Sequence, residues 1–123
     1  NTNQVKAFLS EMLEKLRELH IKIMQADQVA NRVLFHYINR KFNPGLKEEL
    51  AELSRLDEHI KTMRSYLQPV HYVLRPLLGS VERPLDPNQE EVITMRMRSH
   101  LYTGMRTSLE FVLPLLDDLV KAQ

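Results

Sequence analysis

The sequence predicts an all-α protein, an elongated antiparallel bundle of three long helices. Proline-containing breaker segments divide the chain into three stretches, and only three glycines among 123 residues leave little loop-forming capacity. In the first third, apolar residues recur at alternating steps of four and three, the spacing of a helix face laid along a partner helix. This heptad seam consists of Val5, Leu9, Met12, Leu16, Leu19, Ile23, Ala26, Ala30, Val33 and Tyr37.

We expect the first helix to span about residues 3–41 and to end before Asn43-Pro44-Gly45. Proline disfavours the helical conformation at the residue before it, and glycine tolerates the turn that follows. So short a link is typical of two helices that pack as antiparallel neighbours.

The second helix is predicted over about residues 46–79. Pro69 and Pro76 lie inside it, and each removes one amide donor from the helical hydrogen-bond ladder. Kinks at prolines would divide the three helices into four or five segments. The apolar seam of this helix consists of Leu53, Leu56, Ile60, Met63, Leu67, Val70, Leu74 and Leu77.

The third helix is predicted over about residues 87–121, after a loop at 80–88. Asp86 before Pro87 has the pattern of an N-cap with proline at the first helical position. Pro114 predicts one more kink. The seam here consists of Met95, Tyr102, Met105, Leu109, Val112, Leu116 and Leu119, and Arg98 interrupts it.

Composition fits a single domain over residues 1–123, since a hydrophobic fraction of 43% is enough to form a core. The net charge of +1 gives no general attraction to nucleic acid or anionic membranes. The absence of cysteine and of an apolar run of about 20 residues favours a cytoplasmic location with no membrane span. Because the chain begins at Asn1 rather than methionine, we expect a fragment of a larger protein.

Charge is graded along the chain. Residues 1–41 carry seven basic and four acidic side chains, whereas residues 84–123 carry four basic and six acidic ones. Opposite local charges favour contact between the first and last helices.

The sequence has no motif typical of a metal site, a phosphate-binding loop or a catalytic nucleophile. No two of the five histidines are three or four residues apart, and no glutamate precedes a histidine by three, so we expect no metal site. There is no thiol, no glycine-rich phosphate loop and no serine in a nucleophile elbow. We therefore predict no catalytic residue and no cofactor, and a protein that is not an enzyme.

A second apolar set lies off the main seam of the first helix, at Phe8, Leu13, Leu34 and Ile38. Such a surplus requires cover, from the third helix or from another chain. We predict these four residues as the partner-binding surface of a protein–protein interaction or oligomerisation domain.

A basic group near the start of the third helix offers another hypothesis. Arg96, Arg98 and Arg106, with Tyr102 between them, could bind an anion such as a nucleic-acid phosphate. Arg98 and Arg106 are eight residues apart and roughly share a face, whereas Arg96 lies elsewhere. The alternative is a solvated face on which the arginine stems cover apolar surface.

The stretch LDEHIKTMRSYLQPVHYVLRPLL, residues 56–78, resembles CorA-type divalent-cation transporters, including the zinc-transporting branch. The likeness is carried by Leu56, Ile60, Met63, Arg64, Leu67, Pro69, Val73 and Leu77. In that family three long helices follow one another before the membrane segments. The resemblance implies a cytoplasmic helical stalk, but the family's Gly-Met-Asn pore motif and both membrane spans are absent from this sequence.

Three functions stay open at this point. The first is a non-catalytic coiled-coil scaffold that binds a protein partner or itself. The second is the transporter stalk, and the third is a nucleic-acid-binding bundle.

Overall fold

In the computed structural model, the chain is described over residues 2–39, 42–66 and 91–123. These ranges form three α-helices and no strand: α1 over Thr2–Ile38, α2 over Leu46–Tyr66 and α4 over Glu91–Ala122. The all-helical fold class is therefore confirmed. The predicted loop at 80–88, the caps before the third helix, and Pro69 and Pro76 lie outside the described residues.

The end of α1 comes three residues earlier than predicted, at Ile38. Asn39 closes it, since both its backbone amide and its side-chain Nδ2 donate to the carbonyl oxygen of Phe35, at 3.1 and 2.8 Å. An asparagine is a common helix terminator because its side chain competes for backbone partners.

The start of α2 follows the expected breaker cluster. The side chain of Asn43 accepts a hydrogen bond from the Gly45 amide at 3.1 Å, and its carbonyl accepts one from the Leu46 amide at 3.2 Å. An asparagine that bonds its own backbone two residues on makes a turn, so this segment supplies the first partners of the new helix.

Pro114 does not divide the last helix. Although proline removes an amide donor and frees the carbonyl four residues earlier, α4 is one continuous helix from Glu91 to Ala122. The kink expected at this proline stays a prediction, because a helix can bend at a proline without being divided.

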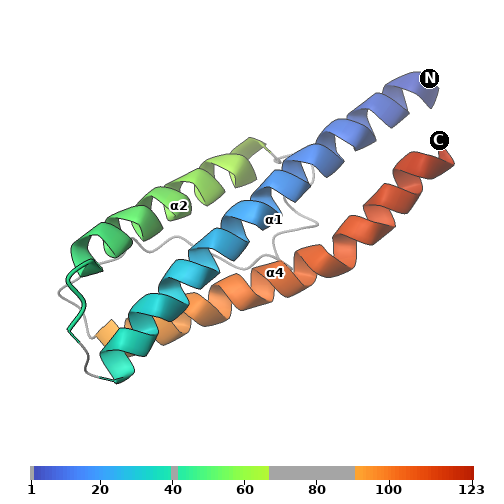
Figure 1. The fold of residues 1–123 in the computed structure, drawn as a ribbon. Coiled ribbons are helices and arrows are strands. Elements are labelled where there is room, and N and C mark those ends of the chain that lie inside the picture. Colours follow the sequence, from blue (N-terminus) through green and yellow to red (C-terminus); the bar gives the residue numbers. More distant parts are fainter. Residues whose placement is uncertain (1, 40–41, 67–90) are drawn as a thin grey trace.

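Packing is organised around α1, which contacts both α2 and α4 (Figure 1). The heptad seam supplies most of the core from this helix. The buried members of the seam are Leu16, Leu19, Ile23, Ala26, Ala30 and Val33. The other helices add Leu53, Ile60 and Met63 from α2, and Met95, Tyr102, Met105, Leu109 and Leu116 from α4.

Two predicted seam positions are not part of this core. Val5 is 45% exposed and Leu119 is 53% exposed. Both lie where the first turns of α1 and the last turns of α4 meet at the same end of the molecule (Figure 1). The seam pattern therefore extends beyond the part of the bundle that is fully covered.

The contacts between α1 and α4 follow opposite residue order. Arg17 pairs with Asp117, whereas Asn31, 14 residues further along α1, accepts a hydrogen bond from Ser99. Residue numbers thus rise along α1 while they fall along α4, which sets the register for all polar contacts between these helices.

Replacing a buried seam residue should lower the free energy of unfolding far more than replacing an exposed seam residue near the chain ends. Leu19→Ala removes a side chain that is 0% exposed, and we expect it to lower the free energy of unfolding by about 2–5 kcal/mol. The matched variant Leu119→Ala should cost about 0.5 kcal/mol or less. Urea unfolding followed by circular dichroism at the helical band measures both, and equal losses would contradict the assigned core.

Candidate interaction surface

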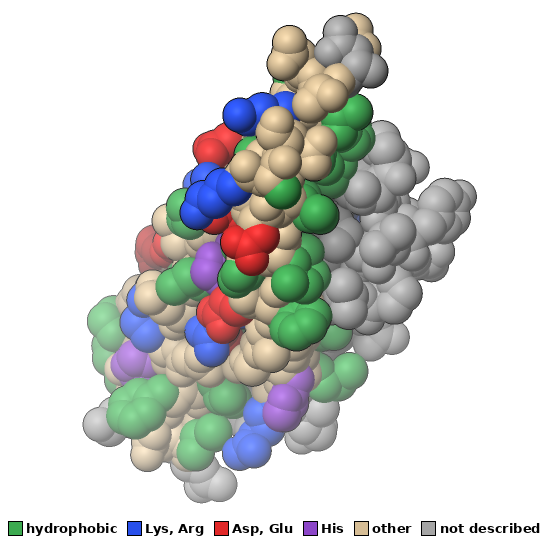
Figure 2. Space-filling view, turned by 90° about the vertical axis from the view of Figure 1, so that its right-hand side faces the viewer, with side chains coloured by type: hydrophobic (Ala, Val, Ile, Leu, Met, Phe, Trp, Pro, Cys, Tyr) green, Lys and Arg blue, Asp and Glu red, His purple; other side chains and the backbone are tan. Residues whose placement is uncertain are grey.

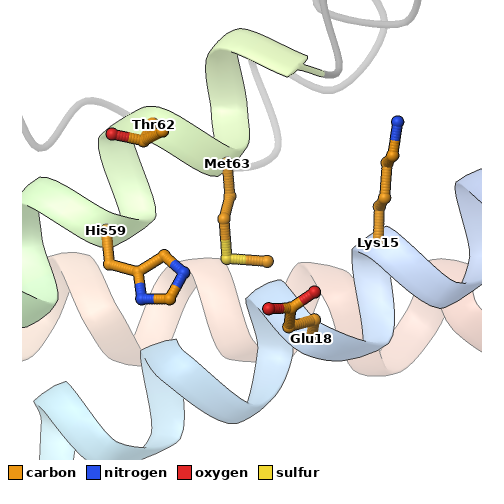
Figure 3. A pocket seen from close by; sticks show the side chains of 5 residues that line it. All are labelled: Lys15, Glu18, His59, Thr62 and Met63. Atoms are coloured by element: carbon orange, nitrogen blue, oxygen red, sulfur yellow. The ribbon is translucent and has the colours of Figure 1, made fainter.

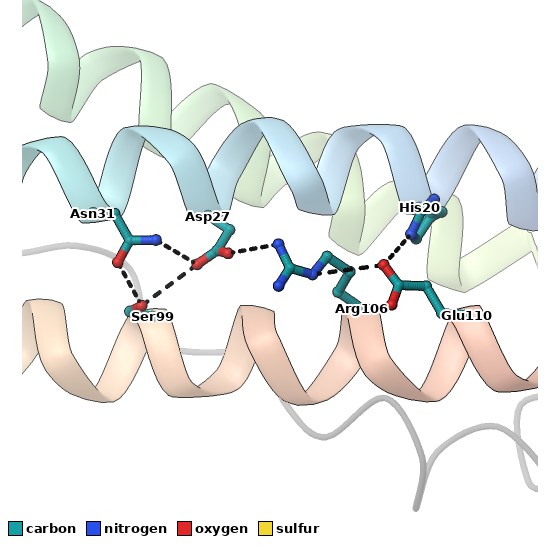
Figure 4. A network of polar contacts seen from close by, with 6 residues as sticks. All are labelled: His20, Asp27, Asn31, Ser99, Arg106 and Glu110. Carbon is teal, nitrogen blue, oxygen red and sulfur yellow. Dashed lines mark hydrogen bonds and ion pairs between the residues drawn. The ribbon is translucent and has the colours of Figure 1, made fainter.

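A buried carboxylate, Asp27, lies at the centre of the contact between α1 and α4 (Figure 4). Its Oδ1 accepts a hydrogen bond from Asn31 Nδ2 at 3.2 Å and lies 3.4 Å from Ser99 Oγ, whose one proton is shared with the nearer Asn31 Oδ1 at 2.9 Å. Its Oδ2 lies 3.3 Å from Nη1 of Arg106. Since a buried charge is tolerated only when it is paired and hydrogen-bonded, these partners fix which residues of α4 lie opposite Asp27.

The same polar line continues toward the chain ends. Glu110 Oε1 lies 3.7 Å from Nε of Arg106 and 3.3 Å from Nε2 of His20. Further along, Asp117 lies 3.3 Å from Arg17 on α1 and 2.9 Å from Lys121 on its own helix. The hydrogen bond from Lys121 holds the pKa of the Asp117 carboxyl below its usual range. Solvated pairs of this kind orient two helices more than they stabilise them.

A second buried carboxylate, Asp57, joins α2 to α4. The Tyr102 hydroxyl donates to its Oδ1, and Nη1 of Arg98 lies 3.5 Å from its Oδ2. Within the described ranges that second oxygen accepts no hydrogen bond, so the nearby guanidinium balances its charge through space. Burial raises the pKa of the Asp57 carboxyl above its usual value. The Tyr102 hydrogen bond and the Arg98 charge lower this pKa and so offset part of the rise.

Tyr102 itself is fully buried in this contact. Burial, with the neighbouring Asp57 charge, raises the pKa of its phenol far above the usual range. The hydroxyl therefore stays protonated and acts as a donor. The contact is an internal clamp between two helices.

The three arginines predicted as an anion site are not brought together. Arg96 is exposed, whereas Arg98 is 5% exposed and faces Asp57. Arg106 faces Asp27 and Glu110. One signal in the sequence indicated this outcome: Arg98 occupies a seam position, and a charge at a seam position requires a buried counter-charge.

Two of the four residues predicted to bind a partner do not lie on the open surface. Leu13 is 4% exposed and Leu34 is packed against the core, so both serve this chain's own interior. Phe8 and Ile38 remain on the surface, with exposed fractions of 51% and 47%.

A stripe of exposed residues runs along α1 beside its contact with α4, where Asn31 accepts a hydrogen bond from Ser99. Its apolar members are Ile21, Met24, Phe35 and Ile38, and Gln28 and Asn31 continue the same spacing between them. We call these six residues the outer stripe. They follow alternating steps of three and four, as the buried seam does. Ile21 lies two positions from Leu19 and from Ile23, about 200° around the helix.

Sequence reasoning missed Ile21, Met24 and Phe35 as surface residues. The available signal was a second 3–4 spacing on the same helix, offset from the stronger seam by two residues. Exposed apolar side chains also occur on α4, at Met97, Phe111, Leu115 and Leu119. In Figure 2, charged and histidine side chains are interspersed with hydrophobic ones over the described surface.

A small hollow of about 160 Å³ lies between α1 and α2 (Figure 3). It is lined by Lys15, Glu18, His59, Thr62 and Met63. Met63 reaches from α2 toward α1, while the Lys15 ammonium points away from the other side chains (Figure 3) and pairs with Glu11 at 3.1 Å. The lining carries no set of convergent polar groups of the kind that orients a ligand.

Metal-binding clusters and membrane spans are both missing from the described ranges. These ranges contain no group of three or more histidine or acidic side chains that could hold a metal ion. None of their three helices is long and apolar enough to cross a bilayer.

The residues that resemble the transporter stalk belong partly to the core. Ile60 and Met63 are buried, and Leu56 is packed against the core. From Leu67 onward the stretch lies outside the described residues. In the described part, the spacing of these apolar residues is therefore what helix packing itself requires.

Comparison with models of protein families, with curated proteins and with solved structures gives no match. The function of the chain therefore has to be inferred from its own residues.

The buried Asp57–Arg98 pair predicts a pH-dependent stability effect. Arg98→Met leaves a buried carboxylate without its counter-charge, and we expect a loss of about 3–5 kcal/mol at pH 7. Because the guanidinium lowers the pKa of Asp57, its removal raises that pKa further. The folded variant then binds the proton more tightly than the unfolded chain, and stability is lost as pH rises through the raised pKa.

The loss relative to the parent chain should therefore be smaller at about pH 4 than at pH 7. Urea unfolding at both pH values measures it. The double variant Asp57→Asn with Arg98→Met is the control, since it removes both charges and should recover much of the loss at pH 7. An equal loss for Arg98→Met at the two pH values would contradict an ionised, buried Asp57.

Proposed function

We propose that this chain is a non-catalytic helical interaction domain that binds another protein chain through the outer stripe of α1. The observation that carries the proposal is the heptad spacing of exposed apolar residues, on either side of Gln28 and Asn31, on a helix whose own seam is already buried. Ile21 and Phe35 are 53% and 52% exposed, and Met24 and Ile38 extend the same line. Scattered apolar residues on a surface need no explanation, whereas apolar residues at heptad spacing along one helix are typical of a helix-binding face.

The energy scale of apolar burial sets the expected strength of such an association. At about 25 cal/mol per Å², burial of 800 Å² of apolar surface gives an upper limit of about 20 kcal/mol before the costs of association. The outer stripe is smaller than this, and the association costs are several kcal/mol or more. A reversible complex is therefore the expected outcome.

The support for α1 favours binding without rearrangement. We propose that the chain is an antiparallel bundle in which α1 is held by α2 on one side and by α4 on another. The opposite residue order of the contacts made by Arg17 and Asn31 supports this arrangement. A helix fixed in this way presents its outer face preformed, which lowers the ordering cost of binding.

The other two functions have less support. A nucleic-acid site would use Arg96, Arg98 and Arg106, but two of these guanidinium groups face carboxylates of the bundle. The transporter-stalk hypothesis rests on residues 56–77 alone, and apolar membrane spans encoded directly downstream would decide it.

The interaction should be lost when charge is placed on the outer stripe. We expect Met24→Glu combined with Phe35→Glu to weaken partner binding at least about tenfold, because carboxylates would be buried in an apolar contact. Cross-linking in cells of the source organism, followed by quantification of every species linked to the chain, measures this loss.

Phe111→Glu is the matched control, since Phe111 is 72% exposed on α4 and lies off the stripe. Circular dichroism confirms that each variant keeps its helices. If every cross-linked species persists in the stripe variant, the proposed function is wrong.

A further inference from the structure

We draw no further inference here: the strongest candidate, the exposed apolar face of α4 formed by Met97, Phe111, Leu115 and Leu119, carries none, because nothing in the structure shows what covers it.

Discussion

The structure depends on the burial of the α1 heptad seam against two neighbours at once. Almost no surface is exposed at three seam residues, Leu16, Leu19 and Ile23, although only two other described helices are present to cover them. Burial of that order is possible only when helices cover the seam from more than one side. α1 contacts both α2 and α4, so the seam determines where the other two helices lie. The polar contacts between the described helices are then placed by that packing.

The buried carboxylates add orientation to this apolar packing. Apolar burial is not directional, and a seam of leucines tolerates sliding by a heptad. Asp27 and Asp57 remove that freedom, because each is satisfied only when particular donors of α4 lie opposite it. The arginines Arg98 and Arg106 are therefore part of the fold's specificity. This also explains why an anion site that looked plausible along one helix is not formed in three dimensions.

Periodicity predicted the parts of the fold that depend on one helix at a time. The seam of α1 and the turn at Asn43-Pro44-Gly45 follow from local spacing and backbone preference, and both are found. What periodicity could not supply is which off-seam residues a neighbour covers. Leu13 and Leu34 have the same apolar character as Phe8 and Ile38, yet the first two are enclosed and the second two are not. That difference arises from the angular positions of neighbouring helices, which no single-helix pattern contains. Pro114 is a similar case, since α4 continues through it despite the local cost.

The outer stripe and the internal register are linked through one side chain. Asn31 belongs to the stripe, and both polar atoms of its amide are engaged by Asp27 and Ser99 within the chain. A partner that binds the central layer of the stripe therefore binds an amide whose orientation depends on the α1–α4 contact. Any shift of α4 along α1 would break the hydrogen bond from Ser99 and free that amide to turn. A polar centre also limits the stripe's affinity for unrelated apolar surfaces, because an unmatched partner would leave the amides of Gln28 and Asn31 unsatisfied.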